Sequence, residues 1–206
     1  MFEDRKAANA YPVVVWLGRW WLPLLIGVIA VMAEAGGDTA RAVLRYERVP
    51  VVEGEYWRLL TGHFVHLGWA HLLMNMLALL LIWLLVGYRL NGRDWLLAVA
   101  IIITTIDAGF WWLDTQLVWY VGFSGVLHGM LLAGLVAQWR HASGEIWLLG
   151  ALLLAKLIYE QAAGPLPGSA ASAGGDVVVN AHLYGAAGGL LAVAAAKIRV
   201  VRSRSI

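Results

Sequence analysis

The chain has 206 residues, of which 61% are hydrophobic and only 14% are charged. An ordinary soluble domain carries about a quarter charged residues, so this composition predicts a membrane protein. The absence of cysteine excludes disulfides, thiol catalysis and cysteine-ligated zinc.

Six apolar segments are long enough to cross about 30 Å of hydrocarbon. In chain order they lie at about 16–35, 67–88, 95–113, 122–139, 145–163 and 178–197. We therefore predict an all-α polytopic membrane protein, a six-helix bundle that forms a single domain over residues 1–206. The one sizeable polar loop, 36–66, is partly amphipathic, and we expect it to rest on the membrane surface.

The distribution of lysine and arginine predicts the orientation of the helices. With both termini in the cytoplasm, that side collects the basic residues near the two ends and in the short loops, whereas the other side has only those of loop 36–66. The positive-inside rule favours this arrangement. It accounts for the basic character of the chain, so we expect no nucleic-acid partner.

Polar residues inside the predicted helices gather near one depth. His71 and Asn75 are four residues apart and share a helix face. Ser124 opens the fourth helix from the external side, and His182 lies early in the sixth, which is also entered from that side. A serine beside a histidine is a nucleophile beside its base.

Small residues follow both members of this pair. Each is followed by two glycines four residues apart, a spacing that lets helix backbones approach closely in lipid. Contact between these faces would bring the hydroxyl and the imidazole within about one helical turn. The glycines are Gly125 with Gly129, and Gly185 with Gly189.

Other interpretations of these polar residues remain open. Serine and glycine in membrane helices are commonly packing residues. A metal site at His63, His66 and His71 lacks a suitable carboxylate, so we predict no metal and no cofactor. Asp107 has no evident role and leaves a small ion transporter as an alternative.

Two further sets of polar side chains have simpler explanations. Lys156 and Glu160 are one turn apart and are expected to pair with each other near the external end of the fifth helix. His141 lies beside Arg140 in a short loop, where we expect it to be solvated.

Four motifs in order give the chain a resemblance to the rhomboid intramembrane serine proteases. They are WR at 57–58, H-x-x-x-N at 71–75, GFSG at 122–125 and AHLYGAAGG at 181–189. The resemblance implies a Ser124–His182 catalytic dyad, with His71 and Asn75 supporting the oxyanion. We expect no third acid to be required, because packing can orient the imidazole.

Gly122, His66 and His128 are candidate accessory residues under this resemblance. Many rhomboids have a tyrosine four residues after the serine, where this chain has His128. As an alternative base, His128 could lean back toward the hydroxyl, but His182 matches the family position and is preferred. His128 is then expected to orient His182 or to contact substrate.

The S-G-x-x-H-G string and the short chain are similar to the rhombosortase branch of the family. This similarity implies a bacterial inner-membrane protease with both termini cytoplasmic. Its expected partner is an exported, membrane-anchored protein with a small-residue-rich segment, one helix and a basic tail, cleaved near the external end of that helix. The alternative from another class is a non-catalytic rhomboid-like protein that binds membrane helices.

Overall fold

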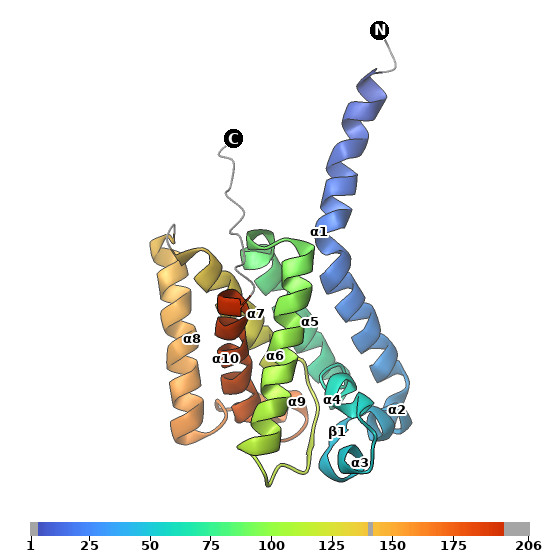
Figure 1. The fold of residues 1–206 in the computed structure, drawn as a ribbon, viewed down its shortest axis with the longest axis vertical. Helices are drawn as coiled ribbons and strands as arrows, with labels where there is room; N and C mark the ends of the chain where they lie inside the picture. Colours follow the sequence, from blue (N-terminus) through green and yellow to red (C-terminus); the bar gives the residue numbers. More distant parts are fainter. Residues whose placement is uncertain (1–3, 140–141, 196–206) are drawn as a thin grey trace.

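The structure is a computed structural model that describes residues 4–139 and 142–195, with side chains described from residue 18 onward. Within these residues, four helices are long and apolar enough to cross a membrane, and two shorter apolar helices accompany them. Figure 1 shows them as a bundle in which α1 begins, and α10 ends, at the same end of the molecule. The chain is a multi-pass helical membrane protein.

Each of the six predicted apolar segments contains a helix. Their bounds are α1 Asp4–Ala35, α5 Trp69–Val86, α6 Gly92–Trp112, α7 Ser124–Ala137, α8 Gly144–Ala163 and α10 Val179–Ala195. A short 3-10 turn, Gly87–Arg89, follows α5. The prediction placed the start of the third helix at 95, but Asn91 caps α6 earlier by accepting from the Asp94 N–H at 2.9 Å. His141 and the predicted end of the last helix at 197 lie outside the described residues.

The segment expected as a polar surface loop is folded. It contains α2 Gly37–Leu44, β1 Tyr46–Glu47, α3 Arg48–Val52 and α4 Trp57–Thr61. Strand β1 pairs antiparallel with β2 Trp119–Tyr120, just before α7. This segment is therefore tied to the chain that leads into Ser124.

Arg58, from the WR motif, organises this segment from within. Its side chain is buried, and it donates to the carbonyl oxygens of Ala42 at 2.8 Å and Arg45 at 3.0 Å. It also forms an ion pair with Glu55 at 2.6 Å. A guanidinium group suits this position because it offers five donors in a fixed geometry.

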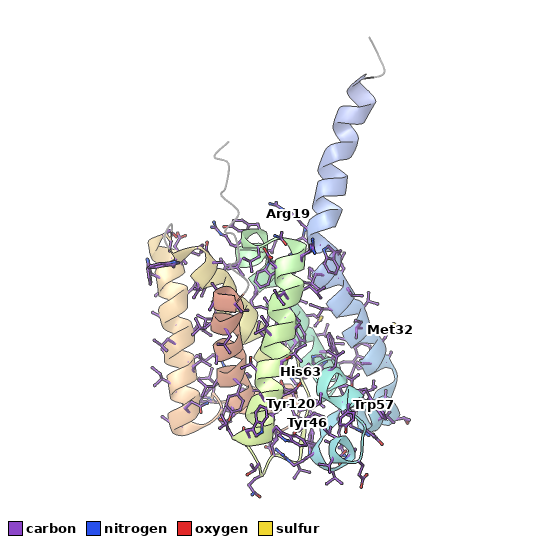
Figure 2. The ribbon with its side chains drawn as sticks, in the orientation of Figure 1. Arg19, Met32, Tyr46, Trp57, His63 and Tyr120 are labelled. Atoms are coloured by element: carbon purple, nitrogen blue, oxygen red, sulfur yellow. The ribbon has the colours of Figure 1, made fainter. Side chains whose placement is uncertain are left out.

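Helix α10 lies at the centre of the bundle, packed against α6 and α7. Its small residues make this possible: a Cβ at Gly188 would crowd α6 at Ile102 and Thr105. Helix α8 lies at the periphery, with Leu148, Leu152 and Leu154 exposed. Figure 2 shows Met32 pointing outward from α1, where its side chain is also exposed. Such an apolar outer surface suits lipid rather than water.

Candidate active site

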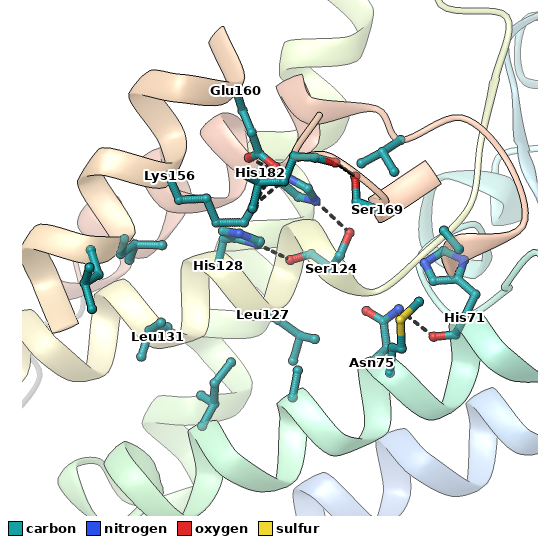
Figure 3. Close-up of a pocket in the computed structure, with 18 of the residues that line it drawn as sticks. His71, Asn75, Ser124, Leu127, His128, Leu131, Lys156, Glu160, Ser169 and His182 are labelled. Carbon is teal, nitrogen blue, oxygen red and sulfur yellow. Dashed lines mark hydrogen bonds and ion pairs between the residues drawn. The ribbon is translucent and has the colours of Figure 1, made fainter. Parts of the chain in front are cut away.

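A cavity of about 450 Å³ opens between α5, α7, α8 and α10. The short helix α9, Ser169–Ala173, contributes Ser169 and Ala173 to its lining. Polar groups from five helices face this cavity, and Figure 3 shows them gathered around Ser124. The rest of the lining is mainly leucine.

Ser124 and His182 lie in contact at this cavity. The serine Oγ is 3.0 Å from His182 Nε2. Ser124 is the first residue of α7 and is partly buried, whereas His182 lies one turn into α10 and is 4% exposed. The two helices bring together residues that are 58 positions apart in the sequence.

The glycine pairs of α7 and α10 explain this approach. A Cβ added at Gly185 would overlap the carbonyl oxygen of Gly125, and one added at Gly189 would overlap that of Gly129. In the other direction, a Cβ at Gly125 would lie 2.8 Å from the Ala181 carbonyl oxygen. The predicted contact between the two glycine faces is therefore present, and we call it the glycine seam.

His128 packs on His182 rather than on the serine hydroxyl. The two rings are stacked, with centroids 4.1 Å apart and planes at 18°. His128 Nδ1 lies 2.7 Å from the carbonyl oxygen of Ser124, which can only accept, so this nitrogen carries a proton. The geometry therefore favours His182, and not His128, as the partner of the hydroxyl.

Glu160 contacts the far side of the His182 ring. Its Oε2 lies 2.9 Å from His182 Nδ1, and its Oε1 accepts from Lys156 Nζ at 2.6 Å. The expected pair between Lys156 and Glu160 is present. The contact between Glu160 and His182 was not predicted, because the sequence suggested a dyad without an acid. One sequence signal was available: Glu160 lies near the end of its helix that the sequence predicts to be external, at the depth predicted for His182.

His128, Glu160 and His182 also offer ligand atoms that lie within 4.8 Å of one another, close enough for one metal ion. The orientation of the rings is unfavourable for this. A metal binds in the plane of an imidazole, along the nitrogen lone pair, and the two stacked rings direct their lone pairs along nearly parallel planes. The Lys156 ammonium on Glu160 adds a positive charge at the same place. The cluster therefore fits a hydrogen-bond network better than a metal site.

His71 lines the same cavity as Ser124 and offers a donor there. Its Nδ1 accepts from the Leu67 N–H at 3.3 Å, so in the neutral ring the proton lies on Nε2. A Cβ added at Gly122 would lie 3.1 Å from His71 Cε1 and 4.0 Å from Ser124 Oγ. Gly122 has a φ of +123°, which favours glycine. This glycine therefore keeps the space between the ring and the serine open.

Asn75 lies one turn further along α5, next to His71. Its Nδ2 donates to the His71 carbonyl at 2.9 Å, and its Oδ1 is buried without a hydrogen-bond partner among the described residues. The second amide hydrogen remains available to a group bound in the cavity. The N-terminus of α7 adds further donors, because the first four N–H groups of a helix have no intrahelical partner.

His66 lies behind His71 and does not line the cavity. Its ring is fully buried and meets the His71 ring edge to face, with centroids 5.0 Å apart. Burial, together with the charge that His71 would carry, lowers the pKa of His66 to about 3, so it is neutral at physiological pH. The structure thus places His66 as a support for the His71 ring.

The segment before Ser124 is fixed from two sides. Tyr120 donates its hydroxyl hydrogen to the Gly122 carbonyl at 2.6 Å, and burial raises the pKa of this hydroxyl. The Gly122 N–H donates to the Gly62 carbonyl at 3.2 Å. Figure 2 labels Tyr46, His63 and Tyr120 near one another in the lower half of the view.

Asp107, which the sequence left unexplained, has a partner in this region. One of its carboxylate oxygens lies 3.2 Å from His63 Nε2. His63 is buried and packs edge to face on Tyr120. Asp107 therefore links α6 to the segment that supports the serine.

Comparison with known proteins identifies the family of this chain. Two relatives named Rhomboid protease GlpG, from Salmonella paratyphi A (strain ATCC 9150 / SARB42) and Salmonella typhi, are each 27% identical over 134 residues, covering 63% of this chain and 43% of the relative. The chain thus spans less than half the length of the curated relatives it matches. The family model described as Rhomboid domain matches residues 53–198, a stretch that includes Ser124, His182, His71 and Asn75. With most of its length matched by this model, the chain belongs to the rhomboid family.

Proposed function

We propose that this protein is an intramembrane serine endopeptidase in which Ser124 is the nucleophile and His182 is the general base. The observation that carries this proposal is the 3.0 Å contact between Ser124 Oγ and His182 Nε2 inside a cavity with an apolar lining. A hydroxyl is a weak nucleophile on its own and needs an adjacent base.

The reaction follows from the groups around the serine. Ser124 Oγ attacks a peptide carbonyl carbon while His182 takes its proton. The carbonyl oxygen becomes an oxyanion, to which the Ser124 N–H, His71 Nε2–H and the Asn75 amide donate. His182 then gives its proton to the leaving amine as the C–N bond breaks, leaving an acyl-enzyme at Ser124.

The length of α7 supports cleavage inside the membrane. Its 14 residues extend about 21 Å, less than the roughly 30 Å of a hydrocarbon core. A helix of this length with its far end at one interface begins below the other interface. Ser124 would then meet substrate bonds near the end of a membrane helix, not at its middle.

Entry of a substrate is best explained between α5 and α8. The cavity is lined by Leu149, Leu152 and Leu153 of α8, and few of the residues in the apolar span of α8 are buried. The segment 164–176 after it is rich in glycine and small residues. We propose that α8 and this segment together form the gate.

We further propose a substrate of the rhombosortase type: an exported protein released by removal of its C-terminal helix and basic tail. A substrate helix must unwind before its carbonyls can be attacked, and each glycine lowers that cost by about 1 kcal/mol. Small residues are therefore expected at the cleaved bond. The stacking of His128 on His182, where many rhomboids place a tyrosine, supports this branch.

The proposed location is a bacterial inner membrane with both termini in the cytoplasm and the serine end of α7 facing outward. Reporter fusions at the C-terminus and after Gly168 test this topology. We expect a cytoplasmic signal from the first and an external signal from the second. A cytoplasmic signal after Gly168 would overturn the orientation.

Labelling by a fluorophosphonate probe tests the enzyme class. We expect labelling of the wild-type chain and none of Ser124→Ala or His182→Ala. Ser169→Ala is the matched control, because Ser169 lines the same cavity but donates its hydroxyl hydrogen to the Leu166 carbonyl at 2.7 Å. Labelling that persists in Ser124→Ala would contradict the proposal, and loss in His128→Ala with retention in His182→Ala would move the base to His128.

The substrate is tested by co-expression with a protein that carries a glycine- and serine-rich segment, one helix and a basic tail. Mass spectrometry should find a new C-terminus within the small-residue segment. Cleavage at an N-terminal anchor, or equal cleavage after leucines replace the small residues, would contradict the rhombosortase assignment and leave the protease proposal intact.

A further inference from the structure

Helix α8 brings a carboxylate to the side of His182 that faces away from the serine. We propose that Glu160 is a positioning residue that fixes the tautomer of His182, so that the site works as a Ser124–His182–Glu160 triad in which Glu160 stays ionised. This inference rests on the proposed protease function. It adds an acid to a site that the sequence alone suggests is a dyad.

The tautomer of His182 depends on which neighbour bonds Nδ1. Glu160 Oε2 lies 2.9 Å from this nitrogen, and the Lys156 ammonium lies 3.4 Å from it. A carboxylate only accepts, so it requires a proton on Nδ1, whereas an ammonium only donates and would require a bare Nδ1. Only the first arrangement leaves a lone pair on Nε2 for the Ser124 proton. Glu160 therefore selects the form of His182 that can act as a base.

Lys156 completes this arrangement by keeping Glu160 charged. Glu160 is 3% exposed, and a buried carboxylate is costly unless it is paired and hydrogen-bonded. Lys156 lies four residues earlier on α8, bonds Oε1 at 2.6 Å, and keeps 29% of its side chain exposed toward the cavity. With Oε1 on Lys156 and Oε2 on His182, both oxygens of the carboxylate are used.

The substitution that tests the role is Glu160→Gln, which keeps the shape of the side chain but removes its charge. An amide can donate to Nδ1 as well as accept from it, so the tautomer is no longer selected. We expect the maximal rate of inactivation by a fluorophosphonate to fall roughly 100-fold, with little change in the probe concentration for half-maximal rate. Glu160→Asp keeps the charge and should recover part of this loss.

Glu145→Gln is the matched control, because Glu145 lies in the first turn of the same helix and is exposed. It should react at the wild-type rate. Lys156→Met leaves Glu160 in place but removes the cation that keeps it charged, so we expect an intermediate loss, smaller than that of Glu160→Gln. All variants are compared as the full chain in detergent.

A spectroscopic measurement separates positioning from a general structural role. The chain has six histidines, so ¹⁵N-histidine labelling gives a small set of imidazole signals, and His182→Ala identifies the one of interest. We expect His182 to be protonated on Nδ1 in the wild type and to lose this preference in Glu160→Gln. This readout needs no activity, so it stands even if the wild-type chain fails to label.

Three results would overturn the proposed role of Glu160. These are wild-type inactivation kinetics in Glu160→Gln, an equal loss in Glu145→Gln, and a wild-type His182 already protonated on Nε2. Should Glu160→Gln fail to fold, Glu160→Asp and the wild-type spectrum decide the same question. Absence of labelling in the wild type would instead count against the proposed protease function.

Discussion

The two helices that contact His182, α7 and α8, pack in opposite ways. The glycine seam joins α7 to α10 by backbone contact and carries Ser124 and His182, whereas α8 is a peripheral leucine-rich helix that carries Lys156 and Glu160. At the seam there is no room for even a methyl group, but at Gly150 of α8 an added Cβ meets nothing within 4 Å. Ser124 and His182 are thus held by close backbone packing, whereas the carboxylate that contacts His182 comes from a peripheral helix.

This contrast gives a physical reason for the division of tasks. A nucleophile and its base must hold their geometry to within about half an ångström, which requires a closely packed support. A membrane substrate must also reach them from the side, which requires a wall that yields. Placing the two requirements on different helices lets each be met without the other.

The largest effect is expected from alanine at the centre of the seam. Gly185→Ala places a methyl group against the Gly125 carbonyl oxygen, so we expect a loss of about 3 kcal/mol of stability and loss of labelling. Gly150→Ala, the same change on α8, should be neutral or stabilise by up to about 1 kcal/mol. Thermal unfolding in detergent measures both. Equal effects from the two variants would break the comparison.

The next largest effect is expected from Asn75→Ala, on the α5 side of the cavity. It removes a proposed oxyanion donor without touching the contact between Ser124 and His182. A donor of this kind contributes on the order of 3 kcal/mol, so the cleavage rate should fall roughly 100-fold with stability little changed. A wild-type rate would remove Asn75 from the site.

Asp107→Asn tests how much the contact between Asp107 and His63 stabilises the segment before Ser124. The change removes the carboxylate that bonds His63, and we expect a loss of about 1 kcal/mol of stability with labelling within a few-fold of wild type. A liposome assay should detect no Asp107-dependent ion flux. Flux that disappears in Asp107→Asn would instead support the transporter interpretation.

The smallest effect is expected on the exposed side of α8. Leu152 is 57% exposed, so Leu152→Ala should change stability by no more than about 0.5 kcal/mol. Thermal unfolding of Leu152→Ala and Gly185→Ala, measured together, compares the smallest and the largest expected loss of stability. A loss comparable to that of Gly185→Ala would mean that α8 is as firmly packed as the seam.

Local pattern in the sequence was enough for much of this molecule. Apolar runs mark the helices because length and hydropathy are properties of a single segment. The i, i+4 spacing puts His71 and Asn75 on one face, and the glycine spacing predicts where α7 and α10 meet. These features repeat with the period of a helix, so they can be read before the fold is known.

Other features depend on contacts between segments far apart in the chain. The pairing of β1 with β2 involves two residues from each strand, too few to leave a pattern. Glu160 satisfies the i, i+4 pattern with Lys156, which hides its second bond to His182. That bond exists only because α8 packs beside α10, and helix periodicity says which face a residue occupies but not which helix will cover it.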